Sequence, residues 1–156
     1  MDSAVLLPLA TLVLGSVLTF TLEAIRHRRQ RKESVQDARR LERSQAYVDY
    51  LECAHEAAHL LGRATPGCPN PLEDIAHSYW LVDSSVASRL RVIEVLGSED
   101  VISRAKGMRT ALVTFRRDLQ SEEMTYWSEE YQDAYGLVVS ARGAFIEAAR
   151  SDLRQT

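Results

Sequence analysis

Residues Ser98–Leu119, SEDVISRAKGMRTALVTFRRDL, decide the fold class, because they carry the clearest periodic pattern in the chain. Ser98 is suited to cap a helix, and Glu99 and Asp100 would follow in the first turn, where the helix dipole favours acidic side chains. Apolar residues then recur in steps of four and three, which is the spacing of a bundle seam. They are Val101, Ala105, Met108, Leu112, Phe115 and Leu119.

Three further stripes of apolar residues with helical spacing predict three more helices. The first stripe lies in 47–61, and Gly62 is expected to end its helix. The second helix is expected to begin at Asn70-Pro71, a capping residue followed by a residue that suits the first turn. The last helix is expected to begin at Ser121 or Ser128, since each precedes a pair of glutamates. Its buried face is expected to contain Tyr131, Tyr135, Val138, Phe145, Ala149 and Leu153, with Arg142 on the same face.

Together these patterns predict an all-α fold, an antiparallel bundle of about four helices. No stretch alternates polar and apolar residues for long enough to predict a strand. Between Glu23 and Leu61 the chain contains neither proline nor glycine. The N-terminal transmembrane helix described next is therefore expected to be continuous with the first helix of the bundle.

The N-terminal part is predicted to be a transmembrane anchor. Residues Ala4–Leu22, AVLLPLATLVLGSVLTFTL, are 19 residues without a charge, close to the length that crosses the ~30 Å hydrocarbon core of a bilayer. No basic residue precedes this run, whereas a signal peptide begins with basic residues and ends at a small-residue cleavage site. A retained span is expected, and a secreted domain released by cleavage is the alternative. Small residues at Thr11, Gly15 and Thr19 share one face of the span, which would allow a homodimer through it.

Basic residues follow the span and set its orientation. Because Lys and Arg beside a span stay inside, the N-terminus is expected outside the cell inner (plasma) membrane and the C-terminal domain in the cytoplasm. Five of them are expected to contact anionic lipid headgroups: Arg26, Arg28, Arg29, Arg31 and Lys32. The domains predicted are a transmembrane anchor at 1–25, a basic juxtamembrane helical stalk at 26–43 and a cytoplasmic helical bundle at 44–156. In the bundle 17 acidic residues outnumber 11 basic ones, so no nucleic-acid partner is expected.

One short motif has the residues for catalysis. His55-Glu56-Ala57-Ala58-His59 places two imidazoles one helical turn apart, where they can bind zinc, with Glu56 placed to deprotonate a zinc-bound water. The stretch Cys53–Gly62 therefore resembles the helix of the zincin metallopeptidases. That resemblance implies a zinc-dependent hydrolase with His55 and His59 as ligands. In the metzincin branch a third histidine would stand where this chain has Thr65, and in the gluzincin branch Glu73 is available as the third ligand.

The remaining observations oppose catalysis. No strand is predicted along which a zincin would bind its substrate, and the two histidines fall at the edge of the apolar stripe, an ordinary solvated position. No catalytic residue, cofactor or metal is therefore expected, and the zinc hydrolase stays the alternative. A purely structural zinc is a separate alternative, in which His55 and His59 are joined by Cys68 and by Asp74 or His77.

Other side chains are expected to have structural or contact roles. Cys53 and Cys68 are expected to be reduced in the cytoplasm. Trp80 and Trp127 are expected to pack in the core or to contact a partner. Arg89 and Arg142 interrupt apolar faces and are expected to pair with acidic residues such as Asp83 or Glu147.

The layout as a whole resembles a class of uncharacterised bacterial single-pass membrane-anchored helical-domain proteins. The resemblance is carried by the single N-terminal span, the Arg-rich helix behind it, the aromatic segment Tyr47-Val48-Asp49-Tyr50-Leu51, and the final segment Phe145–Leu153, FIEAARSDL. It implies a fold and an anchor but no activity. The sequence therefore favours a membrane-tethered helical module that interacts with, or serves as a scaffold for, an unidentified protein partner.

Overall fold

The computed structural model describes residues 3–72, 75–119 and 124–155, and side chains in 34–72, 82–119 and 124–155. Its four helices are α1 (Ser3–Ala64), α2 (Ile75–Leu96), α3 (Glu99–Leu119) and α4 (Glu129–Gln155). The part of the chain that the structure describes contains no strand. The prediction of an all-α fold is confirmed.

The chain divides into two compact units, Met1–Arg39 and Arg40–Thr156, and α1 contributes residues to both. Among the residues searched, which are those that the structure describes, no helix is long and apolar enough to cross a bilayer. The anchor predicted at 1–25 and the five basic residues behind it lie outside the residues whose side chains are described. The second unit, of which residues 40–72, 75–119 and 124–155 are described, contains the helical bundle.

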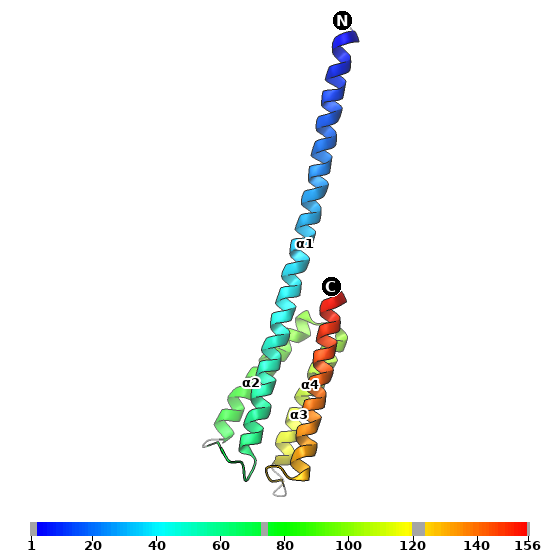
Figure 1. The fold of residues 1–156 in the computed structure, drawn as a ribbon. Helices are drawn as coiled ribbons and strands as arrows, with labels where there is room; N and C mark the ends of the chain where they lie inside the picture. The colour runs from blue at the N-terminus through cyan, green and yellow to red at the C-terminus, as the bar shows by residue number, and fades with distance from the viewer. Residues whose placement is uncertain (1–2, 73–74, 120–123, 156) are drawn as a thin grey trace. The chain divides into compact units, whose positions relative to one another are not determined.

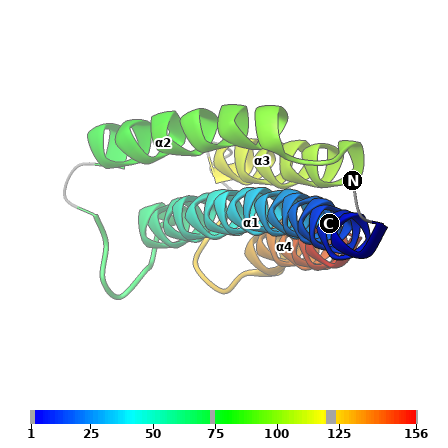
Figure 2. The ribbon, with the colours of Figure 1, turned by 90° about the horizontal axis from the view of Figure 1, so that it is seen from above.

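In this unit the helices run alternately up and down, so each is antiparallel to the next (Figure 1). α2 and α4 flank the C-terminal half of α1, as the view from above also shows (Figure 2). The contacts agree with this order, because Asp49 of α1 pairs with Arg89 of α2 and Tyr47 of α1 bonds to Asp152 of α4. α3 packs against both α2 and α4 and completes the bundle.

The bundle core is formed by the predicted apolar stripes. Five of the six seam positions of α3 are buried, and the sixth, Leu119, packs partly buried against the core. Tyr50 of α1 lies at the centre, fully buried, with its ring centroid 5.3 Å from that of Phe145. Its hydroxyl donates a 2.7 Å hydrogen bond to the carbonyl oxygen of Ala105. One side chain of α1 thereby contacts both α3 and α4.

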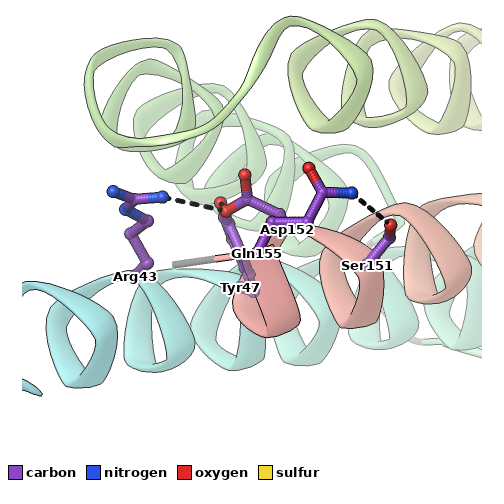
Figure 3. A network of polar contacts seen from close by, with 5 residues as sticks. All are labelled: Arg43, Tyr47, Ser151, Asp152 and Gln155. Atoms are coloured by element: carbon purple, nitrogen blue, oxygen red, sulfur yellow. Dashed lines mark hydrogen bonds and ion pairs between the residues drawn. The ribbon is translucent and has the colours of Figure 1, made fainter.

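A polar network joins α1 to the C-terminal end of α4 (Figure 3). The Tyr47 hydroxyl donates to Oδ2 of Asp152 over 2.7 Å, and Nη1 of Arg43 lies 3.3 Å from the same oxygen. The Tyr47 ring is buried and meets the Phe145 ring edge-on, with centroids 6.0 Å apart. One turn further along α4, Nε2 of Gln155 donates to Oγ of Ser151. Charge-assisted hydrogen bonds to one carboxylate therefore hold this end of the bundle together.

The structure decides between the two predicted starts of the last helix. α4 begins at Glu129, and Oγ of Ser128 accepts a 3.3 Å hydrogen bond from the backbone N–H of Tyr131. This is the bond of an N-cap side chain, so Ser128 caps the helix. The alternative start, Ser121, lies outside the described residues.

The predicted start of the second helix at Asn70-Pro71 is wrong. Residues 71 and 72 are not helical, and α2 begins at Ile75. The reason lies in Arg63, whose Nε donates to the carbonyl oxygen of Asn70 over 2.9 Å and whose Nη2 lies 3.4 Å from that of Pro71. These bonds from a side chain of α1 hold Asn70 and Pro71 in the connection that follows α1.

Three predictions about individual side chains are also corrected. Tyr135 was placed on the buried face, yet it is 39% exposed, because the buried stripe passes through Ala134 to Val138 instead. Arg142 is exposed, and Ala141 takes the place beside the core. Arg89 pairs with an acidic residue as expected, but the example given, Asp83, is corrected to Asp49 of α1, at 3.0 Å.

The two buried tyrosines of α1 should make the protein sensitive to alkali. Burial raises the pKa of Tyr50, and burial together with the hydrogen bond to Asp152 raises the pKa of Tyr47. A raised pKa means that the folded state keeps the neutral hydroxyl. This stabilisation is complete below the pH of about 10 at which an unfolded tyrosine ionises, and it is lost as the pH rises above that value.

We expect Tyr50→Phe to lower the free energy of unfolding at pH 7 by about 1 kcal/mol, because one hydrogen bond is lost. Above pH 10 the free energy of unfolding of the variant should also fall less steeply than that of the wild type, by up to about 1.4 kcal/mol per pH unit. Urea unfolding of the full chain at several pH values measures both effects. Equal alkaline slopes for the wild type and the variant would contradict the burial of this hydroxyl.

Candidate binding pocket

Two connections meet at the end of the bundle opposite to Arg43. We call this the loop end; it consists of residues 65–72 after α1 and residues 124–128 before α4. The backbone N–H of Tyr126 donates a 2.8 Å hydrogen bond to the carbonyl oxygen of Pro66, which joins the two connections directly. Gly67 next to it has φ 83°, a conformation that favours glycine. The buried Thr65 closes α1, since its Oγ1 donates to the carbonyl oxygen of Leu61.

Aromatic side chains gather at the loop end. Tyr131 at the start of α4 is buried, and its ring centroid lies 5.2 Å from that of Tyr126 and 6.0 Å from that of Trp127. It also stacks on Tyr135, with centroids 6.0 Å apart and ring planes 6° apart. Below them Phe115 of α3 meets Tyr131 edge-on at 5.7 Å. These edge-to-face and stacked contacts connect the cluster to the bundle core.

Trp127 is the most exposed member of this cluster. Its side chain is 66% exposed, and its φ of 69° is a conformation that residues other than glycine rarely adopt. Its neighbours hold it there, because Ser128 caps α4 and Nε2 of Gln132 donates a 3.2 Å hydrogen bond to the Trp127 carbonyl oxygen. Strained backbone around an exposed aromatic side chain is more typical of functional sites than of packing.

The aromatic cluster forms one side of a cavity of about 210 Å³, which we call the loop-end pocket. Tyr126, Trp127, Tyr131 and Tyr135 line this side. α1 and the connection after it contribute the other side, with His55, Ala58, His59, Gly62, Arg63 and Cys68. None of the described residues that line the pocket is acidic. The pocket therefore combines aromatic faces with one permanent positive charge and several hydrogen-bond donors.

Two features concern the Tyr131 hydroxyl, its close contact with α1 and its protonation state. A Cβ atom at Gly62 would lie 3.0 Å from the hydroxyl oxygen of Tyr131, so glycine allows the tyrosine to approach the backbone of α1 closely. Burial raises the pKa of Tyr131, with smaller contributions from Tyr126, Tyr135 and Cys68. The Tyr131 hydroxyl accordingly remains a neutral hydrogen-bonding group at physiological pH.

The histidines of the HEAAH motif both lie at this pocket. His55 and His59 are exposed and line it together with Cys68, whereas Glu56 is exposed but is not among the lining residues. Cys53 and Cys68 are free thiols. Among the residues searched, which are the described ones, no three histidine, cysteine, aspartate or glutamate side chains are placed to hold one metal ion. Asp74 and His77, the other ligands considered, lie outside the residues with described side chains.

The sequence predicted some of this site and not the rest. Trp127 was expected to pack or to contact a partner, and its exposure agrees with the second of these roles. The contribution of Arg63 and Tyr126 was not predicted, because Arg63 is in the last turn of α1, beyond the apolar stripe, and Tyr126 comes from an irregular connection without a periodic pattern. The dipeptide Tyr126-Trp127, directly before a capping serine, was a signal in the sequence that could have pointed to this pocket.

Comparisons with models of protein families, with curated proteins and with solved structures found no match. The two resemblances stated from the sequence remain predictions.

The close approach at Gly62 can be tested against a matched glycine. Gly107 of α3 has no atom within 4 Å of the place its Cβ would take. We expect Gly107→Ala to stabilise the chain by about 0.5–1 kcal/mol, the usual gain from removing a helical glycine. Gly62→Ala should lack this gain, because the Tyr131 hydroxyl must move. Urea unfolding of both full-length variants measures the difference, and equal stabilisation by the two would contradict the contact.

Proposed function

We propose that this chain is a membrane-tethered helical interaction module without catalytic activity, which contacts a protein partner through the loop-end pocket. The observation that carries the proposal is the exposed side chain of Trp127, which has a positive φ and belongs to an aromatic cluster at one end of a packed bundle. Trp, Tyr and Arg are the residues most enriched at the energetic centres of protein interfaces. The loop-end pocket has Trp127, three tyrosines and Arg63 in its lining.

The proposed tether is supported by the sequence. The uncharged run Ala4–Leu22 precedes the basic residues of 26–32, and this order favours a retained span with the bundle in the cytoplasm. The small residues Thr11, Gly15 and Thr19 on one face would allow a second proposed contact, a homodimer through the span. Within the bundle, the loop end lies about 28 Å along α1 from Arg43, since 19 helical residues separate Arg43 from Gly62. The pocket is thus at the end of the bundle away from where the chain enters it.

The topology of the tether can be tested in intact cells. We expect the chain to stay in the membrane fraction after a carbonate wash and the bundle to resist a protease added outside. After the membrane is permeabilised, the same protease should cut the bundle. Cleavage before permeabilisation, or a bundle released into the medium, would overturn the proposed orientation.

Contact through the loop end can be tested with a photo-crosslinking residue in the full chain. Placed at Trp127, it should give a discrete adduct in native membranes, because a side chain there would face the partner. The matched control is Val95, which is 82% exposed on α2. The same adduct from both positions, or no adduct at Trp127, would contradict the proposed contact surface.

The zinc hydrolase is retained as the second candidate, because His55 and His59 lie together at the rim of one pocket. A zincin would bind one zinc ion per chain through these two imidazoles, with Glu56 as the base. We expect the purified full chain to retain less than about 0.1 zinc per chain after dialysis against zinc. One zinc per chain that is lost in His55→Ala would instead favour the hydrolase.

A further inference from the structure

The size of the loop-end pocket limits what it can accept. Its volume of about 210 Å³ lies below the ~300–1,000 Å³ of pockets that enclose whole small molecules or cofactors. A single planar ring is of suitable size. Most of its lining comes from α1 and α4, and the remaining residues come from two connections that are hydrogen-bonded to each other. The pocket therefore lies on an ordered part of the fold rather than on a free loop.

The walls of the pocket suit an aromatic group. On the aromatic side of the pocket, Tyr126 and Trp127 meet edge-on with ring centroids 5.3 Å apart, and Tyr135 lies flat against Tyr131. Trp127 and Tyr135 are both partly exposed, so they keep ring surface available to a further aromatic ring. Offset or edge-on contacts with such surfaces are more favourable than their buried area alone predicts.

The charge of the pocket differs from that of the bundle. Residues 44–156 carry 17 acidic and 11 basic side chains, yet the described lining of the pocket contains Arg63, two histidines and no carboxylate. The Arg63 guanidinium is held at the pocket by hydrogen bonds to the carbonyl oxygens of Asn70 and Pro71. Such bonds leave its positive charge intact and occupy two of its five N–H donors. A carboxylate is the group that best matches a fixed guanidinium.

From these observations we infer that the loop-end pocket binds an aromatic side chain flanked by carboxylates, presented by a flexible acidic segment of the partner. The aromatic ring packs against the exposed ring surface of Trp127 and Tyr135, and a neighbouring carboxylate accepts hydrogen bonds from Arg63. The bundle as a whole has an excess of acidic side chains, whereas the described lining of this pocket has a positive charge and no carboxylate, so the charge of the pocket complements an acidic segment. The inference rests on the proposed function, because it names the chemistry of the partner at the same site.

The test uses the full chain in nanodiscs of zwitterionic lipid and a fluorescein-labelled heptapeptide with one phenylalanine between two pairs of glutamates. Fluorescence polarisation should report saturable binding. Replacing the phenylalanine by alanine, or the four glutamates by lysines, should weaken binding at least about tenfold. Equal binding of the acidic and the lysine peptides, or of the phenylalanine and the alanine peptides, would overturn the inference.

Variants of the chain locate the site. Trp127→Ala should weaken binding of the acidic peptide at least about tenfold, whereas Leu137→Ala, at an exposed leucine on α4, should have no effect. Arg63→Gln should weaken it about three- to fivefold, while Arg63→Lys keeps the charge and should retain most of the preference for glutamate over lysine peptides. Arg91→Gln on the exposed surface of α2 is the matched control. Unchanged binding in Trp127→Ala would overturn the assignment to this pocket.

A competition experiment distinguishes a peptide ligand from a free small aromatic acid. Phenylpropionate should displace the peptide only at concentrations well above those of the unlabelled peptide itself. Displacement at equal concentrations would overturn the peptide assignment and point to a free aromatic acid. If all peptides fail while the crosslink at Trp127 succeeds, the interaction module stands and only the proposed chemistry of its partner is wrong.

Discussion

The buried side chain of Tyr50 fixes the bundle, because it joins three helices at one point. Its ring packs against Phe145 of α4, and its hydroxyl donates to the carbonyl oxygen of Ala105 in α3. A helix that is held at one such point keeps its register over its whole length. One turn before Tyr50, Tyr47 meets Asp152, and three turns after it Gly62 lies beside Tyr131. The position of the loop-end pocket therefore follows from the packing of a core residue about 18 Å away.

The pocket combines this rigid support with connections that add chemistry. Functional side chains commonly lie on loops that a packed scaffold positions. Here the helices supply His55, His59 and Tyr131 to the pocket, and the connections supply Tyr126 and Trp127. The connection after α1 also supplies the carbonyl oxygens that hold the Arg63 side chain. The hydrogen bond from Tyr126 to Pro66 makes each connection dependent on the other. A change in either one would alter the whole pocket.

The bundle could be predicted from the sequence because its core positions follow the helical period. The stripe from Val101 to Phe115 is buried as predicted, and Ser128 was one of the two starts expected for α4. Tyr135 was misplaced because a step of four from Tyr131 stays on one helix face, while the actual contact surface turns towards Ala134. The start of α2 was misplaced because the Arg63 guanidinium bonds to Asn70 across the loop, a tertiary contact that no local pattern contains.

The pocket could be predicted only in part for the same reason. The HEAAH motif drew attention to His55 and His59 as ligands, and they do lie at the candidate site, but in the company of aromatic rings and Arg63. Residues brought together by two irregular connections have no common period in the sequence. Tertiary contacts place them side by side, among them the hydrogen bond between the two connections and the contacts of Tyr131 with Tyr126 and Trp127.

The most direct measurement is the hydrogen exchange of the Tyr126 backbone amide in the full chain. The structure gives this amide an acceptor, the Pro66 carbonyl oxygen at 2.8 Å, although it lies outside any helix. We expect it to exchange at least about a hundredfold more slowly than an unprotected amide, because the two connections must separate before it can exchange. Exchange at the unprotected rate would mean that the connections are not joined, and the pocket would then not exist as described.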